Sequence, residues 1–134
     1  MNLDGLRPWA GLAGAELADA NVAVAGIPYD LSAVYRRGAA LAPAELRRLS
    51  AVMPPVSEAG EPLGVRIHDL GDVPMPEGVE RGWAAVADRL AEVPPSAFLT
   101  VLGGDHCAGI PVLAAQARRH PGLTVAWIDA HPDL

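Results

Sequence analysis

The chain has 134 residues, of which 51% are hydrophobic and 19% charged, and 10 Lys and Arg against 16 Asp and Glu give a formal net charge of -6. This composition excludes intrinsic disorder, and an acidic chain without a basic run is not expected to bind nucleic acid or an anionic membrane surface. Cys107 is the single cysteine, which excludes an intrachain disulfide framework and favours a reducing, cytoplasmic location, and no apolar run is long enough to span a membrane.

Four short apolar runs predict β-strands at residues 21–27, 65–70, 97–102 and 123–128. The first, third and fourth are nearly continuous apolar stretches, which is typical of strands that are covered on both faces in a parallel sheet. Residues 54–64 are rich in Pro, Gly and Glu and predict a surface loop rather than a domain boundary. The strands therefore predict a sheet that needs helices on its faces.

Three helices are predicted between these strands. The first covers residues 43–52, with Pro43 in its first turn. The second has an apolar face at helical spacing, formed by Trp83, Val86, Ala87 and Leu90. The third repeats that spacing with Ile110, Leu113, Ala114 and Ala117. Basic residues in its last turn and Gly122 just beyond suit a helix C-terminus.

The alternation of strand and helix predicts an α/β fold in which a parallel sheet is covered by helices. In such folds ligands bind at the carboxyl ends of the strands. We expect residues 1–134 to form part of one domain without an internal boundary. Because the last predicted element is a strand with no helix after it, the sheet looks incomplete at its C-terminal end.

The last predicted strand runs directly into Asp129-Ala130-His131-Pro132-Asp133. In an extended chain, polar residues at i, i+2 and i+4 point the same way, so two carboxylates and one imidazole can converge. These donors suit Mn, Fe, Zn or a related divalent ion, and one carboxylate can bridge two ions. The alternative is that the two acids form turns and the histidine lies on the surface.

The third predicted strand ends in Leu102-Gly103-Gly104-Asp105-His106. Paired glycines allow a sharp turn and a close approach of backbones, leaving His106 near the start of the next helix. If this strand and the last one are neighbours, His106 meets Asp129, His131 and Asp133 at one edge of the sheet. That would make most of a two-metal site.

Other polar and aromatic residues give weaker signals. Without a positioned base, Cys107 is interpreted as a small buried residue beside the site. Three acids, Asp30, Asp69 and Asp72, are interpreted as strand-end or turn residues. Trp83 and Trp127 are interpreted as core residues. His68 and His120 are interpreted as surface residues.

The two motifs resemble those of the ureohydrolases, the family of arginase, agmatinase and formimidoylglutamase. LGGDH is similar to their first metal-ligand motif, and IDAHPD to their second. Upstream, GIPYD, RGA and PAELR are similar to three N-terminal segments of the family, and DLGD at residues 69–72 is similar to its DxGD turn. Cys107 stands where the family usually has serine, and Ala42 where a glycine usually precedes the proline.

This resemblance implies an arginase-like three-layer α/β/α fold and a site for two Mn²⁺ ions. His106 and Asp133 would bind one ion, His131 the other, and Asp129 would bridge both. Asp133 would also be the catalytic residue that accepts a hydrogen bond from the attacking hydroxide, and Asp105 would position the site without binding metal. The substrate would be a small guanidino or formimino compound that is hydrolysed at a C–N bond, releasing urea in an agmatinase- or arginase-like reaction, and a full-length protein would be a homo-oligomer.

The family's remaining metal-binding aspartates, its histidine shuttle and its substrate-binding glutamate would lie beyond Leu134. We therefore expect the sequence to be the N-terminal half of such an enzyme, inactive by itself and poorly folded in isolation. The alternative is a naturally short chain, acting as a non-catalytic metal-binding subunit or as half of a site that a partner completes. A relic without function is the third interpretation.

Overall fold

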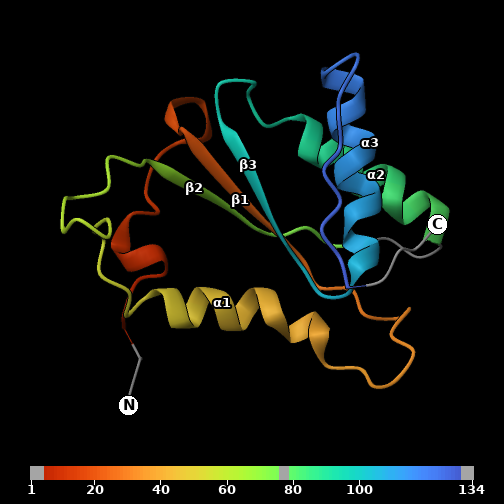
Figure 1. The fold of residues 1–134 in the computed structure, drawn as a ribbon, viewed down its shortest axis with the longest axis horizontal. Helices are drawn as coiled ribbons and strands as arrows, with labels where there is room; N and C mark the ends of the chain where they lie inside the picture. Colours follow the sequence, from red (N-terminus) through yellow and green to blue (C-terminus); the bar gives the residue numbers. More distant parts are fainter. Residues whose placement is uncertain (1–4, 76–78, 131–134) are drawn as a thin grey trace.

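A computed structural model describes residues 5–75 and 79–130 of the chain (Figure 1). Its strands are β1 (Val22–Ile27), β2 (Ile67–Asp72) and β3 (Phe98–Gly103). Its α-helices are α1 (Ala42–Ser50), α2 (Val79–Ala91) and α3 (Gly109–Arg119). Four short 3-10 helices complete it: η1 (Trp9–Gly11), η2 (Leu17–Asp19), η3 (Ala39–Leu41) and η4 (His106–Ala108).

The three strands form one parallel sheet in the order β2-β1-β3. The β1–β3 register is regular from Val22 opposite Phe98 to Ile27 opposite Gly103. The β1–β2 register shifts between Val24 and Gly26. After β1 the chain forms β2 on one side of it, then crosses back and forms β3 on the other side. The strand order therefore reverses between β1 and β3.

Helices cover both faces of this sheet. Figure 1 shows α1 on one face and α2 with α3 on the other, which gives three layers. Both connections join parallel strands through a helix, as the alternating sequence pattern predicted. The predicted α/β class and its parallel, three-layer arrangement are confirmed. Among the described helices none combines the length and apolarity needed to cross a bilayer.

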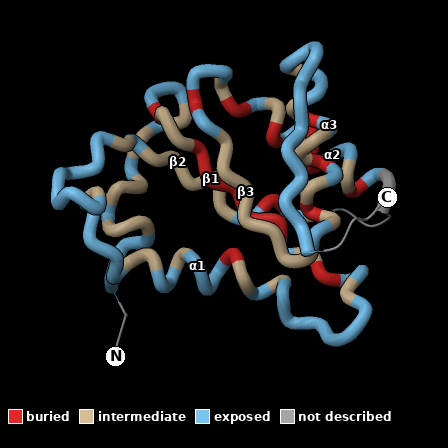
Figure 2. Tube along the Cα trace, viewed as in Figure 1, coloured by how far each residue is buried: buried red, intermediate tan, exposed pale blue. Residues whose placement is uncertain are grey.

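The core lies between the sheet and α2. Strand β1 is buried along nearly its whole length, as the continuous red of its tube shows (Figure 2). Val86, Ala87 and Leu90 of α2 are buried with Ile27 of β1, and Trp83 packs partly buried against them. The predicted apolar face of this helix is confirmed, because both its period and its side-chain sizes suit the sheet.

The predicted apolar face of α3 is wrong. Ile110 is 48% exposed, and Ala114 and Ala117 are exposed as well. The buried positions at this end of the chain are small or compact residues: Ala108, Pro111 and Ala115. Small side chains allow α3 to approach α2 and the sheet closely, and because this helix is apolar on several sides, periodicity did not identify the packed side.

The predicted fourth strand does not form in the described structure. Residues 123–130 have no strand pairing and run back beside α3 as an exposed segment (Figures 1 and 2). Between β3 and α3 lies an open groove of about 690 Å³, and residues 123–125 line it without pairing with β3. An apolar run shows that a segment can be buried, but a strand also requires a neighbour that supplies hydrogen bonds. Within the described residues this run has no such neighbour.

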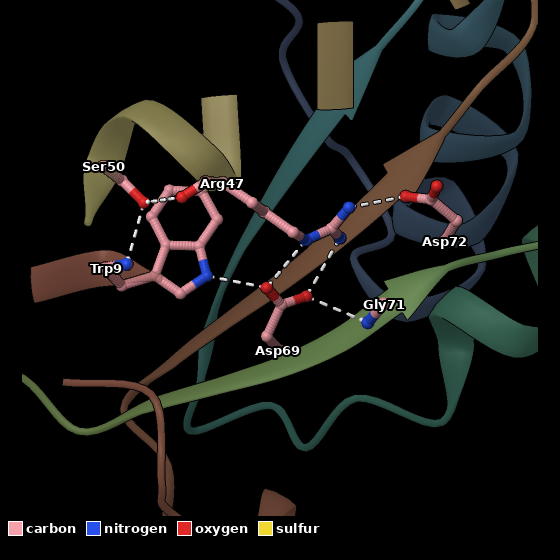
Figure 3. A network of polar contacts seen from close by, with 6 residues as sticks. All are labelled: Trp9, Arg47, Ser50, Asp69, Gly71 and Asp72. Carbon is pink, nitrogen blue, oxygen red and sulfur yellow. Dashed lines mark hydrogen bonds and ion pairs between the residues drawn. The ribbon is translucent and has the colours of Figure 1, made fainter. Parts of the chain in front are cut away.

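An ionic cluster fastens α1 to the carboxyl end of β2 (Figure 3). The Arg47 guanidinium donates to both oxygens of Asp69, with Nε–Oδ2 at 2.8 Å and Nη2–Oδ1 at 2.9 Å, and its Nη1 lies 2.5 Å from Asp72 Oδ1. The Gly71 N–H donates to Asp69 Oδ1 at 2.9 Å. Such a fork fixes the angle of the helix as well as its distance from the sheet.

The same cluster holds the N-terminal segment. The Trp9 indole N–H donates to Asp69 Oδ2 at 2.6 Å, and the Trp9 backbone N–H donates to Ser50 Oγ at 2.8 Å. These bonds hold Trp9 at φ +58°, a left-handed conformation that non-glycine residues rarely adopt. Burial alone would raise the pKa of Asp69, but the hydrogen bonds from Arg47, Trp9 and Gly71 outweigh it and keep that pKa below its ordinary value.

Candidate metal centre

The candidate site lies at the carboxyl ends of β1 and β3, where the strand order reverses. The loop after β1 and the turn after β3 meet there through two backbone hydrogen bonds. The Gly104 N–H donates to the Ile27 carbonyl at 3.0 Å, and the Asp105 N–H donates to the Tyr29 carbonyl at 2.7 Å. A reversal of this kind opens a crevice in which α/β folds bind ligands.

Glycine makes this close approach feasible. A Cβ on Gly104 would lie 2.2 Å from the Tyr29 carbonyl oxygen, and one on Gly103 would lie 2.7 Å from Ala108 Cβ. Both distances are too short for real contacts. A side chain at Gly104 would push the two loops apart, and one at Gly103 would displace the turn that carries His106. The sequence-based prediction that the paired glycines permit a close approach is confirmed, and His106 begins η4 as expected.

Asp105 lies between the two loops and caps the turn that carries His106. Its Oδ1 accepts the Cys107 N–H at 3.0 Å, and its Oδ2 accepts both the N–H and the hydroxyl of Ser32, at 3.2 and 2.5 Å. A carboxylate that accepts these donors at the start of a helix stabilises the turn. Its contacts are those of a residue that positions its neighbours.

His106 contacts Asp129, so the two sequence motifs meet. The Nδ1 atom of His106 lies 2.5 Å from Asp129 Oδ2. The Asp129 side chain is only 12% exposed, whereas that of His106 is 50% exposed. Two donors bound to one first-row ion at about 2.1 Å each would lie roughly 3 Å apart. A small increase in the distance between His106 Nδ1 and Asp129 Oδ2 would therefore make room for an ion bound to both. An imidazole nitrogen and a carboxylate oxygen are suitable donors for such an ion.

Trp127 contributes to the site rather than to the core. It was predicted to be a core residue, but it is 48% exposed, and its ring stacks on His106 with centroids 4.4 Å apart and planes at 10°. The correction follows from the lack of pairing in residues 123–130, since no sheet neighbour covers this segment within the described structure. Stacking on Trp127 and the contact with Asp129 together restrict the orientation of the His106 ring.

The other two predicted ligands, His131 and Asp133, lie outside the described residues. In the part of the chain that the structure describes, no group of three or more His, Cys, Asp or Glu side chains is arranged to hold a metal ion. The roles of His106, Asp129, His131 and Asp133 as metal ligands therefore stay predictions. Of this set the structure brings together His106 and Asp129.

Asp30 shapes the loop that borders the site. Its side chain is buried, and its Oδ2 accepts the Gly38 N–H at 2.6 Å and the Ala40 N–H at 3.2 Å. These two backbone hydrogen bonds, aided by the nearby Arg37 charge, lower the pKa of Asp30. The sequence pattern predicted a strand-end or turn role for Asp30. The resemblance of GIPYD to a family segment assigned this residue no role as an anchor for residues 31–40.

The model of the arginase family matches residues 20–134. The chain therefore belongs to the arginase family. It is 30% identical over 120 residues to an agmatinase of Bacillus cereus, covering 87% of this chain and 41% of that protein. It is 32% identical over 130 residues to an arginase of Bacillus subtilis, covering 87% of this chain and 42% of the relative. The chain thus spans about two fifths of the length of these relatives.

Solved structures agree with the fold. A hypothetical agmatinase from Burkholderia thailandensis superimposes with a TM-score of 0.74 at 25% identity, covering 88% of this chain and 40% of that one. A formiminoglutamase of Trypanosoma cruzi, solved with Mn²⁺, gives a TM-score of 0.74 at 25% identity over 86% of this chain and 42% of its own. The similarity to ureohydrolases inferred from the two motifs is confirmed.

Proposed function

We propose that this protein is a manganese-dependent ureohydrolase that hydrolyses a linear guanidino or formimino C–N bond, and that residues 1–134 are the N-terminal part of its single catalytic domain. The observation that carries the proposal is the 2.5 Å contact between His106 Nδ1 and Asp129 Oδ2, which joins the two motifs at the strand-order reversal. Membership of the arginase family supports the reaction class.

The residues present suit manganese. His106, Asp129, His131 and Asp133 would supply two imidazoles and two carboxylates, and Asp129, which has two carboxylate oxygens, would help to hold both ions. When bound, Mn²⁺ would act as a Lewis acid and make water a nucleophile at neutral pH. Asp133 would accept a hydrogen bond from that nucleophile and orient it toward the substrate carbon. Asp105 would hold the His106 turn in place.

The substrate class follows from the relatives. Those named as agmatinase and arginase support a guanidino substrate with urea as product, and the one named as formiminoglutamase supports a formimino substrate. We further propose a homo-oligomer in the cytoplasm. A single cysteine suits a reducing compartment.

The test uses the native protein with Mn²⁺ and three substrates: arginine, agmatine and N-formimino-glutamate. We expect release of urea or formamide from one of them. His106→Asn and Asp129→Asn should each lower kcat/KM by more than about 100-fold, because even residues that only support metal ligands cost 10–100-fold. His120→Asn is the matched control, since His120 is exposed at the end of α3.

If the protein binds Mn²⁺ but releases no product from any of the three substrates, the proposed enzymatic activity is contradicted. That result would favour the alternative of a non-catalytic or partner-completed metal-binding subunit. A native protein that does not bind Mn²⁺ at all would contradict both.

A further inference from the structure

The hydroxyl of Ser32 makes contacts that the metal-ligand motifs do not account for. Ser32 lies in the loop after β1, 73 residues before Asp105 in the sequence. Its Oγ donates to Asp105 Oδ2 at 2.5 Å, and its backbone N–H donates to the same oxygen at 3.2 Å. Its Oγ also lies 3.0 Å from Cys107 Sγ. One exposed serine therefore contacts the residues on both sides of His106.

These contacts form a directional chain. Because the Ser32 hydroxyl has one proton and donates it to Asp105, the contact with Cys107 is best made by the thiol donating to Ser32 Oγ. The hydrogen bond from Ser32 to Asp105 ends on a carboxylate, which makes it the stronger of the two. The thiol is the weaker donor, so the hydroxyl to carboxylate bond carries most of the restraint.

The effect of this restraint reaches His106 through the backbone. The other oxygen of Asp105 accepts the Cys107 N–H at 3.0 Å, while the Asp105 N–H donates to the Tyr29 carbonyl at 2.7 Å. The backbone is thus fixed on either side of His106. The side chain of His106 is 50% exposed and therefore gains little restraint from burial. Trp127 and Asp129 restrict the ring, whereas the place from which the ring projects depends on the turn that carries it.

We propose that Ser32 is a positioning residue for His106, acting by clamping the Asp105 carboxylate that caps the His106 turn. The effect of Ser32 on metal binding rests on the metal site proposed above. Its clamping of Asp105 does not depend on that site. Removing the hydroxyl should leave Asp105 Oδ2 with the longer bond from the Ser32 backbone N–H, loosen the carboxylate and widen the range of positions that the imidazole samples. A metal ion would then bind more weakly, because outer residues of this kind set ligand geometry.

The test compares Ser32→Ala, Ser32→Thr and Ser57→Ala in the native full chain. Ser57 is the matched control, because its Oγ accepts one backbone N–H, that of Glu61, in an exposed loop. Two quantities are measured: the dissociation constant of Mn²⁺ by calorimetry, and amide hydrogen exchange of Cys107 by NMR. Ser32→Ala should weaken Mn²⁺ binding about tenfold and speed exchange of the Cys107 amide. Ser32→Thr, which keeps the hydroxyl, should restore both, and Ser57→Ala should change neither.

Wild-type values of both quantities in Ser32→Ala would overturn the proposal. If the wild-type protein binds no Mn²⁺, the proposed function fails, and the Cys107 exchange rate alone decides whether Ser32 clamps the turn. Cys107→Ala is a second test of which group holds the His106 turn, and it does not require Ser32→Ala to fold. It removes the thiol and keeps the bond between Ser32 and Asp105, so amide exchange at position 107 should stay as slow as in the wild-type protein. Fast exchange there would show that the thiol, not the hydroxyl, holds the turn.

Discussion

Arg47→Met tests the ionic cluster that fastens α1 to β2. Methionine keeps an apolar stem of similar length but removes all three hydrogen bonds that the guanidinium makes to Asp69 and Asp72. The side chains of Arg47 and Asp69 are only 15% and 17% exposed, whereas that of Asp72 is 41% exposed. The pair with Asp69 therefore counts as largely buried and the pair with Asp72 as a surface pair.

The expected loss is about 3 kcal/mol in the free energy of unfolding. Breaking a buried pair costs roughly 3–5 kcal/mol and a surface pair less than about 1 kcal/mol. The lower end applies because Asp69 would keep the hydrogen bonds from Trp9 and Gly71. Since small domains have about 5–15 kcal/mol of stability in total, this is a large fraction.

The assay is urea unfolding of the native protein, followed by tryptophan fluorescence and circular dichroism. Arg48→Met is the matched control, because the neighbouring Arg48 forms a surface pair with Glu45 in which both side chains are more than half exposed. Its loss should stay below about 0.5 kcal/mol. Equal losses in the two variants, or a loss below about 1 kcal/mol for Arg47→Met, would refute the assignment of the cluster as a buried brace.

Three further results are expected. The pKa of Asp69 is lowered in the folded state. Its contribution to stability is therefore present above its unfolded pKa of about 4 and is lost as the pH falls through the lower folded pKa. Asp69→Asn should remove this acid-induced loss of stability, measured by unfolding from about pH 5 downward. Gly104→Ala should lower the free energy of unfolding by roughly 1–3 kcal/mol or more, measured by thermal unfolding, because the new Cβ meets backbone atoms of Tyr29. Gly14→Ala should be nearly neutral, because the space around Gly14 is open. Equal effects of the two substitutions would contradict the close approach at the site. Asp30→Ala should increase tryptic cleavage after Arg36 and Arg37 several-fold, and an unchanged cleavage rate would show that Asp30 does not anchor this exposed loop.

Local sequence patterns were enough to predict the succession of three strands and three helices, the parallel α/β class and the two motifs of the candidate site. These features depend on local chemistry. Continuous apolar runs predict buried strands, Pro43 predicts a helix start, and Gly104 permits a close backbone approach. The apolar face of α2 could also be predicted, because its opposite side is polar.

Which partners meet depends instead on how the elements pack. The face that α3 buries depends on the close approach of Pro111 and Ala115, and the state of residues 123–128 depends on whether a neighbouring strand is available. Arg47 meets Asp69 across 22 positions, and Ser32 meets Asp105 across 73. Such contacts have no sequence period, because they arise where separate elements pack together. A one-dimensional pattern identifies the donors and acceptors, but the fold selects which of them form a bond.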